Sequence, residues 1–186
     1  MAPNQALERT VTSAFHLRWS LRARRSAPSV RHSMTKARII VDSSVIVSAL
    51  EPNDASHEVS RALVDHLING PYQIRMPMHG LFEIACAFTR LRTVEKTELP
   101  IGFSLGWQKI PMEQVPIDLD FVKEYLDQDL PYLKTGDFIF LAMSKKMGLP
   151  LITNDQELYT KSQDCGVSVF TPQEFLSLAR NKNRNG

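Results

Sequence analysis

Two acidic side chains stand beside apolar segments late in the chain, at positions where carboxylates can do chemistry. Asp137 opens a helical pattern over 138–147 that is apolar on nearly every side, and Asp155 comes just after the apolar strand pattern 151–153. A helix that is apolar all round is a buried helix. Because a buried core has no need of acids at these places, Asp137 and Asp155 are candidates for metal binding or catalysis.

Two further acids have similar surroundings earlier in the chain. Asp42 ends the apolar strand pattern 38–41, and Glu83 lies inside the apolar run 81–86. In an open parallel sheet, ligands bind beyond the carboxyl ends of the strands, so Asp42 and Asp155 are expected at that edge. Carboxylates are hard oxygen ligands that suit Mg²⁺ or Mn²⁺. The four acids together therefore indicate a site for a divalent cation.

Each of these acids also has an ordinary structural explanation. Asp42 can be a turn residue at a strand end, Asp137 a helix N-cap, and Asp155 the cap of a small helix at 156–159. Glu83 can lie on an exposed stripe of its helix, together with His79, Ala87 and Arg90. Taken singly, the structural explanation is the better one for each acid, and only the four together indicate function.

Short strand patterns alternate with helical patterns after residue 36. Strands are predicted at 38–41, 72–76, 151–153 and 167–170, with an extended segment at 110–117. Helices are predicted at 45–50, 56–68, 78–91 and 138–147, and from Pro172 onward. The first of these follows a cap at Ser43-Ser44. A further helix is predicted to begin after a cap at Asp118 or Asp120 and to end at 126. Residues 93–106 give no clear pattern. This alternation predicts an α/β domain of three layers, α/β/α, with a central parallel sheet covered on both faces.

The charge is distributed unevenly along the 186 residues. Residues 1–33 carry six arginines and one acid, a charge of +5, so the rest of a chain with a total of +2 carries −3. We expect a basic N-terminal extension over 1–35, one domain over 36–180 and a polar tail over 181–186. The extension fits disorder, an organelle-type targeting peptide, a nucleic-acid-binding tail, or translation that really starts at Met34.

Neither a membrane span nor a disulfide framework is indicated. No apolar run approaches the roughly 20 residues that a transmembrane helix needs. The two cysteines, Cys86 and Cys165, have no metal-ligand spacing, so a reducing compartment is the default. We therefore expect a cytoplasmic protein with no membrane partner.

The order of the four acids resembles that of the PIN-domain ribonucleases. The residues that carry the resemblance are IIVDSSVIVSAL at 39–50, LFEIACAF at 81–88 and TGDFIFLAMSKKMGLPLITNDQEL at 135–158, within a similarity that spans about 37–175. The last segment is the most specific of the three. The short chain and its single domain look most like the VapC-type toxins of bacterial toxin–antitoxin pairs.

The resemblance implies a metal-dependent endoribonuclease with Mg²⁺ or Mn²⁺ as cofactor. Asp42 and Asp137 are then the principal ligands, and Glu83 and Asp155 complete the site, some of them through water. Hydrogen-bond donors that could orient these acids are Ser44, Thr153 and Asn154. The same three residues are equally readable as helix caps and turn residues.

Binding of RNA to an acidic site requires cations nearby. Lys134 is the best placed in the sequence, just ahead of Asp137, and further candidates are Arg90, Arg92, Lys145 and Lys146. For a toxin, the resemblance also implies a small antitoxin partner and a homodimer.

Three alternatives can be weighed against the nuclease. A catalytically silent PIN fold that binds RNA or protein would be favoured by the loss of an acid, but all four are present. A haloacid-dehalogenase-type phosphotransferase needs a second Asp where Ser44 stands. A receiver-type domain needs an acidic pair where Ile39-Ile40 stands. The nuclease remains the favoured interpretation.

Overall fold

A computed structural model describes residues 36–93, 110–126 and 129–184. The expected N-terminal extension over 1–35 and most of the unpatterned segment 93–106 lie outside these residues. Within the described part of the chain, none of the helices has the length and apolarity needed to cross a membrane.

Five short strands form one parallel sheet in the order β3–β2–β1–β4–β5, which confirms the predicted parallel sheet. The strands are β1 (Ala37–Val41), β2 (Tyr72–Pro77), β3 (Met112–Val115), β4 (Leu151–Ile152) and β5 (Val169–Phe170). The central strand β1 pairs with β2 on one side and with β4 on the other. The chain thus moves outward from β1 in one direction and later in the other, so the crevice between the ends of β1 and β4 is a topological switch point.

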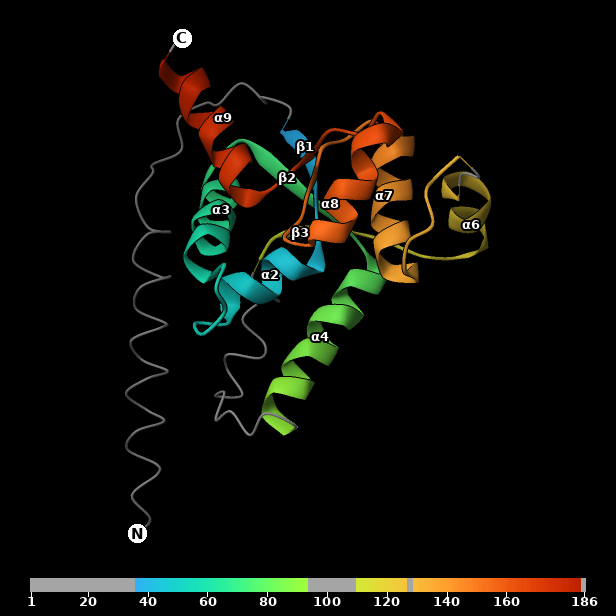
Figure 1. The fold of residues 1–186 in the computed structure, drawn as a ribbon, viewed down its shortest axis with the longest axis horizontal. Coiled ribbons are helices and arrows are strands. Elements are labelled where there is room, and N and C mark those ends of the chain that lie inside the picture. The colour runs from blue at the N-terminus through green and yellow to red at the C-terminus, as the bar shows by residue number, and fades with distance from the viewer. Residues whose placement is uncertain (1–35, 94–109, 127–128, 185–186) are drawn as a thin grey trace, which may run out of the picture.

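Helices cover both faces of the sheet, as the alternating pattern predicts. They are α2 (Ser43–Leu50), α3 (His57–Asn69), α4 (Met78–Thr93), α6 (Leu119–Tyr125), α7 (Thr135–Met147), α8 (Gln156–Ser162) and α9 (Pro172–Arg184). Figure 1 shows α3 and α9 on one side of the strands and α7 and α8 on the other. Helix α9 continues to Arg184, into the segment expected to be a polar tail.

The predicted cap of α2 is wrong by one residue, and the difference concerns the site. Helix α2 begins at Ser43, with Asp42 in the N-cap position, and the Asp42 side chain makes no capping hydrogen bond. The hydroxyls of Ser43 and Ser44 donate to the carboxylates of Glu83 and Asp42. The Asp42 carboxylate is therefore available to the crevice.

Helix α7 is buried along residues 139–144, and its packing also sets the position of α4. Phe140 of α7 is fully buried. A Cβ atom added at Gly80, in the first turn of α4, would lie 2.7 Å from Cζ of Phe140. Only a glycine allows this approach, and it brings the beginnings of α4 and α7 together at the carboxyl edge of the sheet.

This packing predicts a large effect of truncating Phe140. Phe140→Ala should lower the free energy of unfolding by about 3–5 kcal/mol, because the whole ring is removed from a closely packed contact. Leu119→Ala is the control, since Leu119 is 65% exposed, and its effect should stay within about 0.5 kcal/mol. Urea unfolding followed by circular dichroism measures both, and equal losses would contradict this description of the core.

Candidate active site

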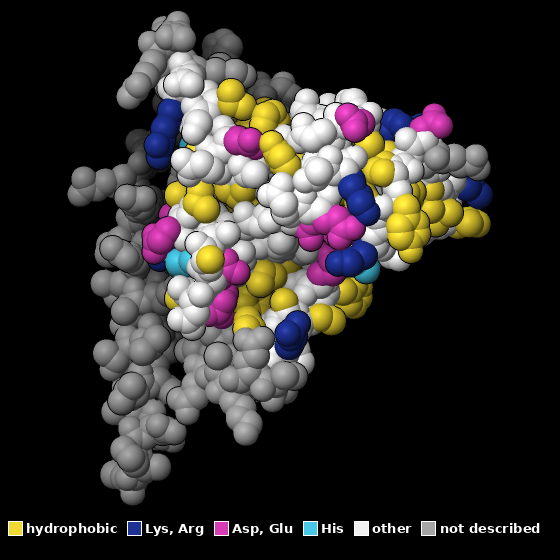
Figure 2. Space-filling model, viewed as in Figure 1, with side chains coloured by type: hydrophobic (Ala, Val, Ile, Leu, Met, Phe, Trp, Pro, Cys, Tyr) yellow, Lys and Arg dark blue, Asp and Glu magenta, His cyan; other side chains and the backbone are white. Residues whose placement is uncertain are grey.

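The four predicted acids come from four elements that meet at the carboxyl edge of the sheet. Asp42 follows β1 directly, Glu83 lies in the second turn of α4, Asp137 is the third residue of α7, and Asp155 is the N-cap of α8. Burial and then the charges of Asp155, Asp42 and Glu83 raise the pKa of Asp137 to about 6. The four carboxylates are thus electrostatic neighbours. Figure 2 shows acidic side chains gathered between α8, α4 and the start of α7.

Asp42 is the most buried of the four acids, with 3% of its surface exposed. Its Oδ2 atom accepts hydrogen bonds from Ser44 Oγ at 2.5 Å and from Thr153 Oγ1 at 2.6 Å. Burial raises the pKa of Asp42, the bonds from Ser44 and Thr153 lower it, and the charge of Glu83 raises it. The burial of this carboxylate is compensated by two neutral hydroxyls. No Lys or Arg of the described residues acts on its pKa.

The backbone after β4 holds those hydroxyls in place. The N–H of Asn154 donates to Ser44 Oγ at 3.2 Å, and the N–H of Asp155 donates to Thr153 Oγ1 at 2.8 Å. The side chain of Asn154 makes no bond to a carboxylate, since its Nδ2 atom donates to Ser60 Oγ on α3 at 2.9 Å. Ser44 and Thr153 therefore contact an acid directly, whereas Asn154 donates to the hydroxyls of Ser44 and Ser60.

Ser43 was not predicted as a site residue, yet it joins two of the acids. Its Oγ atom lies 2.7 Å from Glu83 Oε2 and 3.3 Å from Asp42 Oδ1. A hydroxyl has one proton to donate, and the shorter distance assigns it to Glu83. The sequence signal for Ser43 is its position next to Asp42, but the pair Ser43-Ser44 at this place predicts a helix cap.

Glu83 also approaches the start of α7 closely. Its Oε1 atom lies 3.2 Å from His79 Nε2, one turn earlier on α4. A Cβ atom added at Gly136 would lie 2.2 Å from Glu83 Oε1. Gly136 leaves the room that this position of Glu83 needs. It lies in the segment 135–158 that carries the resemblance, but the sequence gives it no role of its own.

Asp137 and Asp155 differ in how their carboxylates are used. Asp155 Oδ1 accepts from the N–H of Leu158 at 2.8 Å, so Asp155 does cap α8. Asp137 is not a cap, since Lys134 holds that position. Asp137 Oδ2 is buried and has no hydrogen-bond partner among the described residues. The structural explanation therefore accounts for Asp155 in part and fails for Asp137.

The donor set fits a hard divalent cation in its chemistry. It consists of carboxylate oxygens, one of which is the unpartnered Oδ2 of Asp137. In the described ranges, no three His, Cys, Asp or Glu side chains already stand as a ligand shell. Carboxylates repel one another without a cation between them, and here they turn to hydroxyl donors. A cation held by these carboxylates would therefore require their side chains to rotate away from the hydroxyl donors.

Only one of the predicted RNA-binding cations lies at the start of α7. The charge of exposed Lys134 lowers the pKa of Asp137, against the larger effect of burial. Arg90 is exposed on α4, and the side chain of Arg92 lies outside the described part. Lys145 is eight residues after Asp137 in α7, which places it about 12 Å further along the helix axis.

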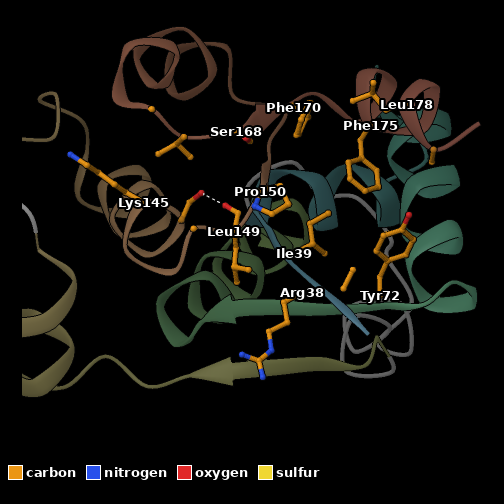
Figure 3. Close-up of a pocket in the computed structure, with 16 residues that line it drawn as sticks. Arg38, Ile39, Tyr72, Lys145, Leu149, Pro150, Ser168, Phe170, Phe175 and Leu178 are labelled. Carbon is orange, nitrogen blue, oxygen red and sulfur yellow. Dashed lines mark hydrogen bonds between the residues drawn. The ribbon is translucent and has the colours of Figure 1, made fainter. Parts of the chain in front are cut away.

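A cavity lies at the opposite edge of the sheet, and Figure 3 shows the residues that line it. Its volume is about 420 Å³, and it is lined at the amino ends of the strands by Ala37, Pro150 and Ser168, with Tyr72 and Phe175 on its wall. Its lining contains no acid. This cavity is therefore separate from the carboxylate site.

A parallel α/β sheet with clustered acids at its switch point defines a class of protein in which the crevice binds the ligand. Comparison with family models identifies the family: the PIN domain model matches residues 39–163. The chain belongs to the PIN domain family. PIN domains are generally nucleases, and PIN-domain nucleases generally use divalent metal ions.

Comparison with solved structures finds similar chains of low sequence identity. The toxin VapC20 of Mycobacterium tuberculosis is 16% identical with a TM-score of 0.50, over 69% of this chain and 95% of that one. VapBC2 of Rickettsia felis, solved with a DNA fragment from its promoter, is 13% identical with a TM-score of 0.48, over 72% and 98%. FitAcB of Neisseria gonorrhoeae is 18% identical with a TM-score of 0.40, over 73% and 98%. No curated protein sequence matches the chain.

The close approach at Gly136 generates a prediction that separates the site from the fold. Gly136→Ala should weaken Mn²⁺ binding by about 10- to 100-fold, because its Cβ displaces Glu83, while a helical alanine keeps or raises stability. Gly148→Ala is the matched control: a Cβ there meets no atom, but the φ of 61° strains an alanine. It should lose stability and keep Mn²⁺ affinity. Calorimetric titration and urea unfolding measure the two effects, and the opposite pattern would refute this role of Gly136.

The raised pKa of Asp137 predicts how cation binding depends on pH. A proton on Asp137 competes with the cation, so Mn²⁺ affinity should rise with pH up to about 6, where the carboxyl ionises, and change less above it. Asp137→Asn should remove that part of the dependence. Titrations between about pH 5 and about pH 8 measure it, and an affinity that is flat across pH 6 in the unaltered chain would contradict it.

Proposed function

We propose that this protein is a ribonuclease that hydrolyses internal phosphodiester bonds of RNA with Mg²⁺ or Mn²⁺, and that it is the toxin of a toxin–antitoxin pair. The observation that carries the proposal is the buried Oδ2 atom of Asp137, which has no described partner and lies among three other carboxylates. Membership of the PIN family supports a nuclease. The proposal adds three points to this: the divalent metal, RNA as the substrate and the toxin role.

The proposed ligands are Asp42 and Asp137, with Glu83 and Asp155 completing the site. A bound divalent cation would supply Lewis-acid activation of water and neutralise charge at the scissile phosphate. Asp42 suits a ligand role because Ser44 and Thr153 both donate to its Oδ2 atom and fix its orientation.

The remaining residues of the site position these acids. Ser43 ties Glu83 to the helix that follows Asp42, and Gly136 leaves room for Glu83 beside α7. Asp137 has a pKa of about 6, which is suited to accepting a proton near neutral pH. Its Oδ2 atom can thus serve as a ligand or as a proton acceptor, and replacing it removes both roles.

Likeness to other proteins supports the proposal that the substrate is RNA and that the protein is a toxin. The order of the acids resembles that of PIN-domain ribonucleases, and VapC20, which shares the fold, is described as a sarcin–ricin loop cleaving toxin. A small antitoxin partner, a homodimer and a cytoplasmic location are parts of the same proposal. Lys134, exposed next to the start of α7, would contact an RNA phosphate.

The proposal is tested by RNA cleavage with the full chain, in Mg²⁺ or Mn²⁺ and in EDTA. Asp42→Asn and Asp137→Asn should each reduce cleavage by about 100-fold or more, because each removes a proposed ligand. Asp120→Asn is the matched control, since Asp120 lies exposed on α6, and it should cleave like the unaltered chain.

Two results would overturn the proposal of a metal-dependent ribonuclease. Cleavage that continues in EDTA, or equally in all variants, would mean that the carboxylates do not carry the activity. A folded chain that neither cleaves RNA nor binds Mn²⁺ would instead be a catalytically silent PIN fold that binds RNA or protein.

A further inference from the structure

Two aromatic side chains are exposed next to the carboxylate site. Phe82 is 66% exposed and Tyr132 is 91% exposed, although aromatic rings normally bury most of their surface. Neither ring takes part in an aromatic pair found among the described residues. Nothing within that part of the chain therefore accounts for their exposure.

Phe82 flanks the site on the α4 side. It directly precedes Glu83, and successive helical residues point about 100° apart. Phe82 and Met78, four residues earlier and 40% exposed, therefore form an apolar stripe beside the stripe of His79 and Glu83. The exposed Phe82 ring therefore lies beside the helix face that carries Glu83.

Tyr132 lies against α8, five residues before Asp137 in the chain. Its carbonyl oxygen accepts from Lys161 Nζ at 3.0 Å, and the same Nζ lies 2.7 Å from Glu157 Oε1 on α8. Lys134 Nζ lies 3.9 Å from Glu157 Oε2. These contacts hold the backbone of Tyr132 against the helix that Asp155 caps, and its ring remains free.

The chemistry of the surroundings favours nucleic-acid bases as what these rings contact. The carboxylates repel phosphates, and Lys134 is the described lysine that acts on Asp137, so the charges close to the carboxylates supply little affinity for RNA. Stacking on aromatic rings supplies affinity that does not depend on charge. Figure 2 shows hydrophobic side chains on both sides of the acidic group.

We propose that Phe82 and Tyr132 stack on RNA bases on either side of the scissile phosphate, which makes them positioning residues for the substrate. This inference rests on the proposed ribonuclease function. Bases can be stacked in this way only when they are unpaired, so the RNA must be single-stranded at the site. A protein partner is better suited to the exposed aliphatic face of α6, formed by Leu119, Val122 and Leu126.

The test compares aromatic with aliphatic replacements in the full chain. Phe82→Leu and Tyr132→Leu should each raise KM for a single-stranded RNA of about 12 nucleotides by about 5- to 150-fold, with little change in kcat. Phe82→Trp and Tyr132→Trp should keep KM near that of the unaltered chain. Leu178→Ala is the control, because Leu178 is 47% exposed but lines the cavity at the opposite sheet edge.

A spectroscopic readout separates stacking from a general structural effect. With Ca²⁺ replacing Mg²⁺, an RNA that carries 2-aminopurine should lose fluorescence on binding the unaltered chain and the Trp variants, and much less on binding the Leu variants. A perfectly paired RNA duplex should compete weakly. Mn²⁺ affinity should be the same in all of these variants.

The outcomes distinguish this inference from the proposed function. Metal-dependent cleavage with an unchanged KM in both Leu variants would overturn the stacking role and leave the nuclease intact. Leu variants that lose self-association while keeping KM would assign the two rings to a protein interface, which also overturns it. No RNA cleavage by the unaltered chain would overturn the nuclease and this inference together.

Discussion

The buried carboxylate of Asp42 is the constraint on which the site depends. It stands where β1 ends, in the crevice between β1 and β4, and is 3% exposed. Burying an ionised acid costs free energy unless donors or cations compensate it. Here Thr153, 111 residues away, and Ser44 both donate to the same oxygen. The ends of β1 and β4 are thereby joined through the Asp42 carboxylate. Stability alone does not explain a buried carboxylate at this place.

Close contacts at two glycines bring Glu83 and the start of α7 together near Asp42. Gly80 lets α4 pack against Phe140, and Gly136 lets Glu83 lie against the start of α7. These contacts crowd the carboxylates, which is why burial and neighbouring charges raise the pKa of Asp137. A bound cation would relieve this repulsion between the carboxylates. The repulsion between the carboxylates thus lowers the stability of the fold at the proposed cation site.

Much of the fold followed from local patterns, whereas the site followed only in part. Strand and helix periods predicted the parallel sheet and the positions of Asp42 and Asp155 at its edge, because these depend on neighbours in sequence. The bond from Ser43 to Glu83 spans 40 residues, and no local pattern encodes it. Lys145 was grouped with Lys134 by charge, yet the length of α7 separates Lys145 from the carboxylates.

The central claim is that the carboxylates around Asp42 and Asp137 hold a divalent cation. The most direct measurement is an anomalous difference map from crystals of the full chain grown with Mn²⁺. A peak within about 2.0–2.3 Å of Asp137 Oδ2 and of an Asp42 oxygen is the result we predict. Mn²⁺ bound elsewhere, or no peak between these two acids in a crystal soaked at saturating Mn²⁺, would contradict it.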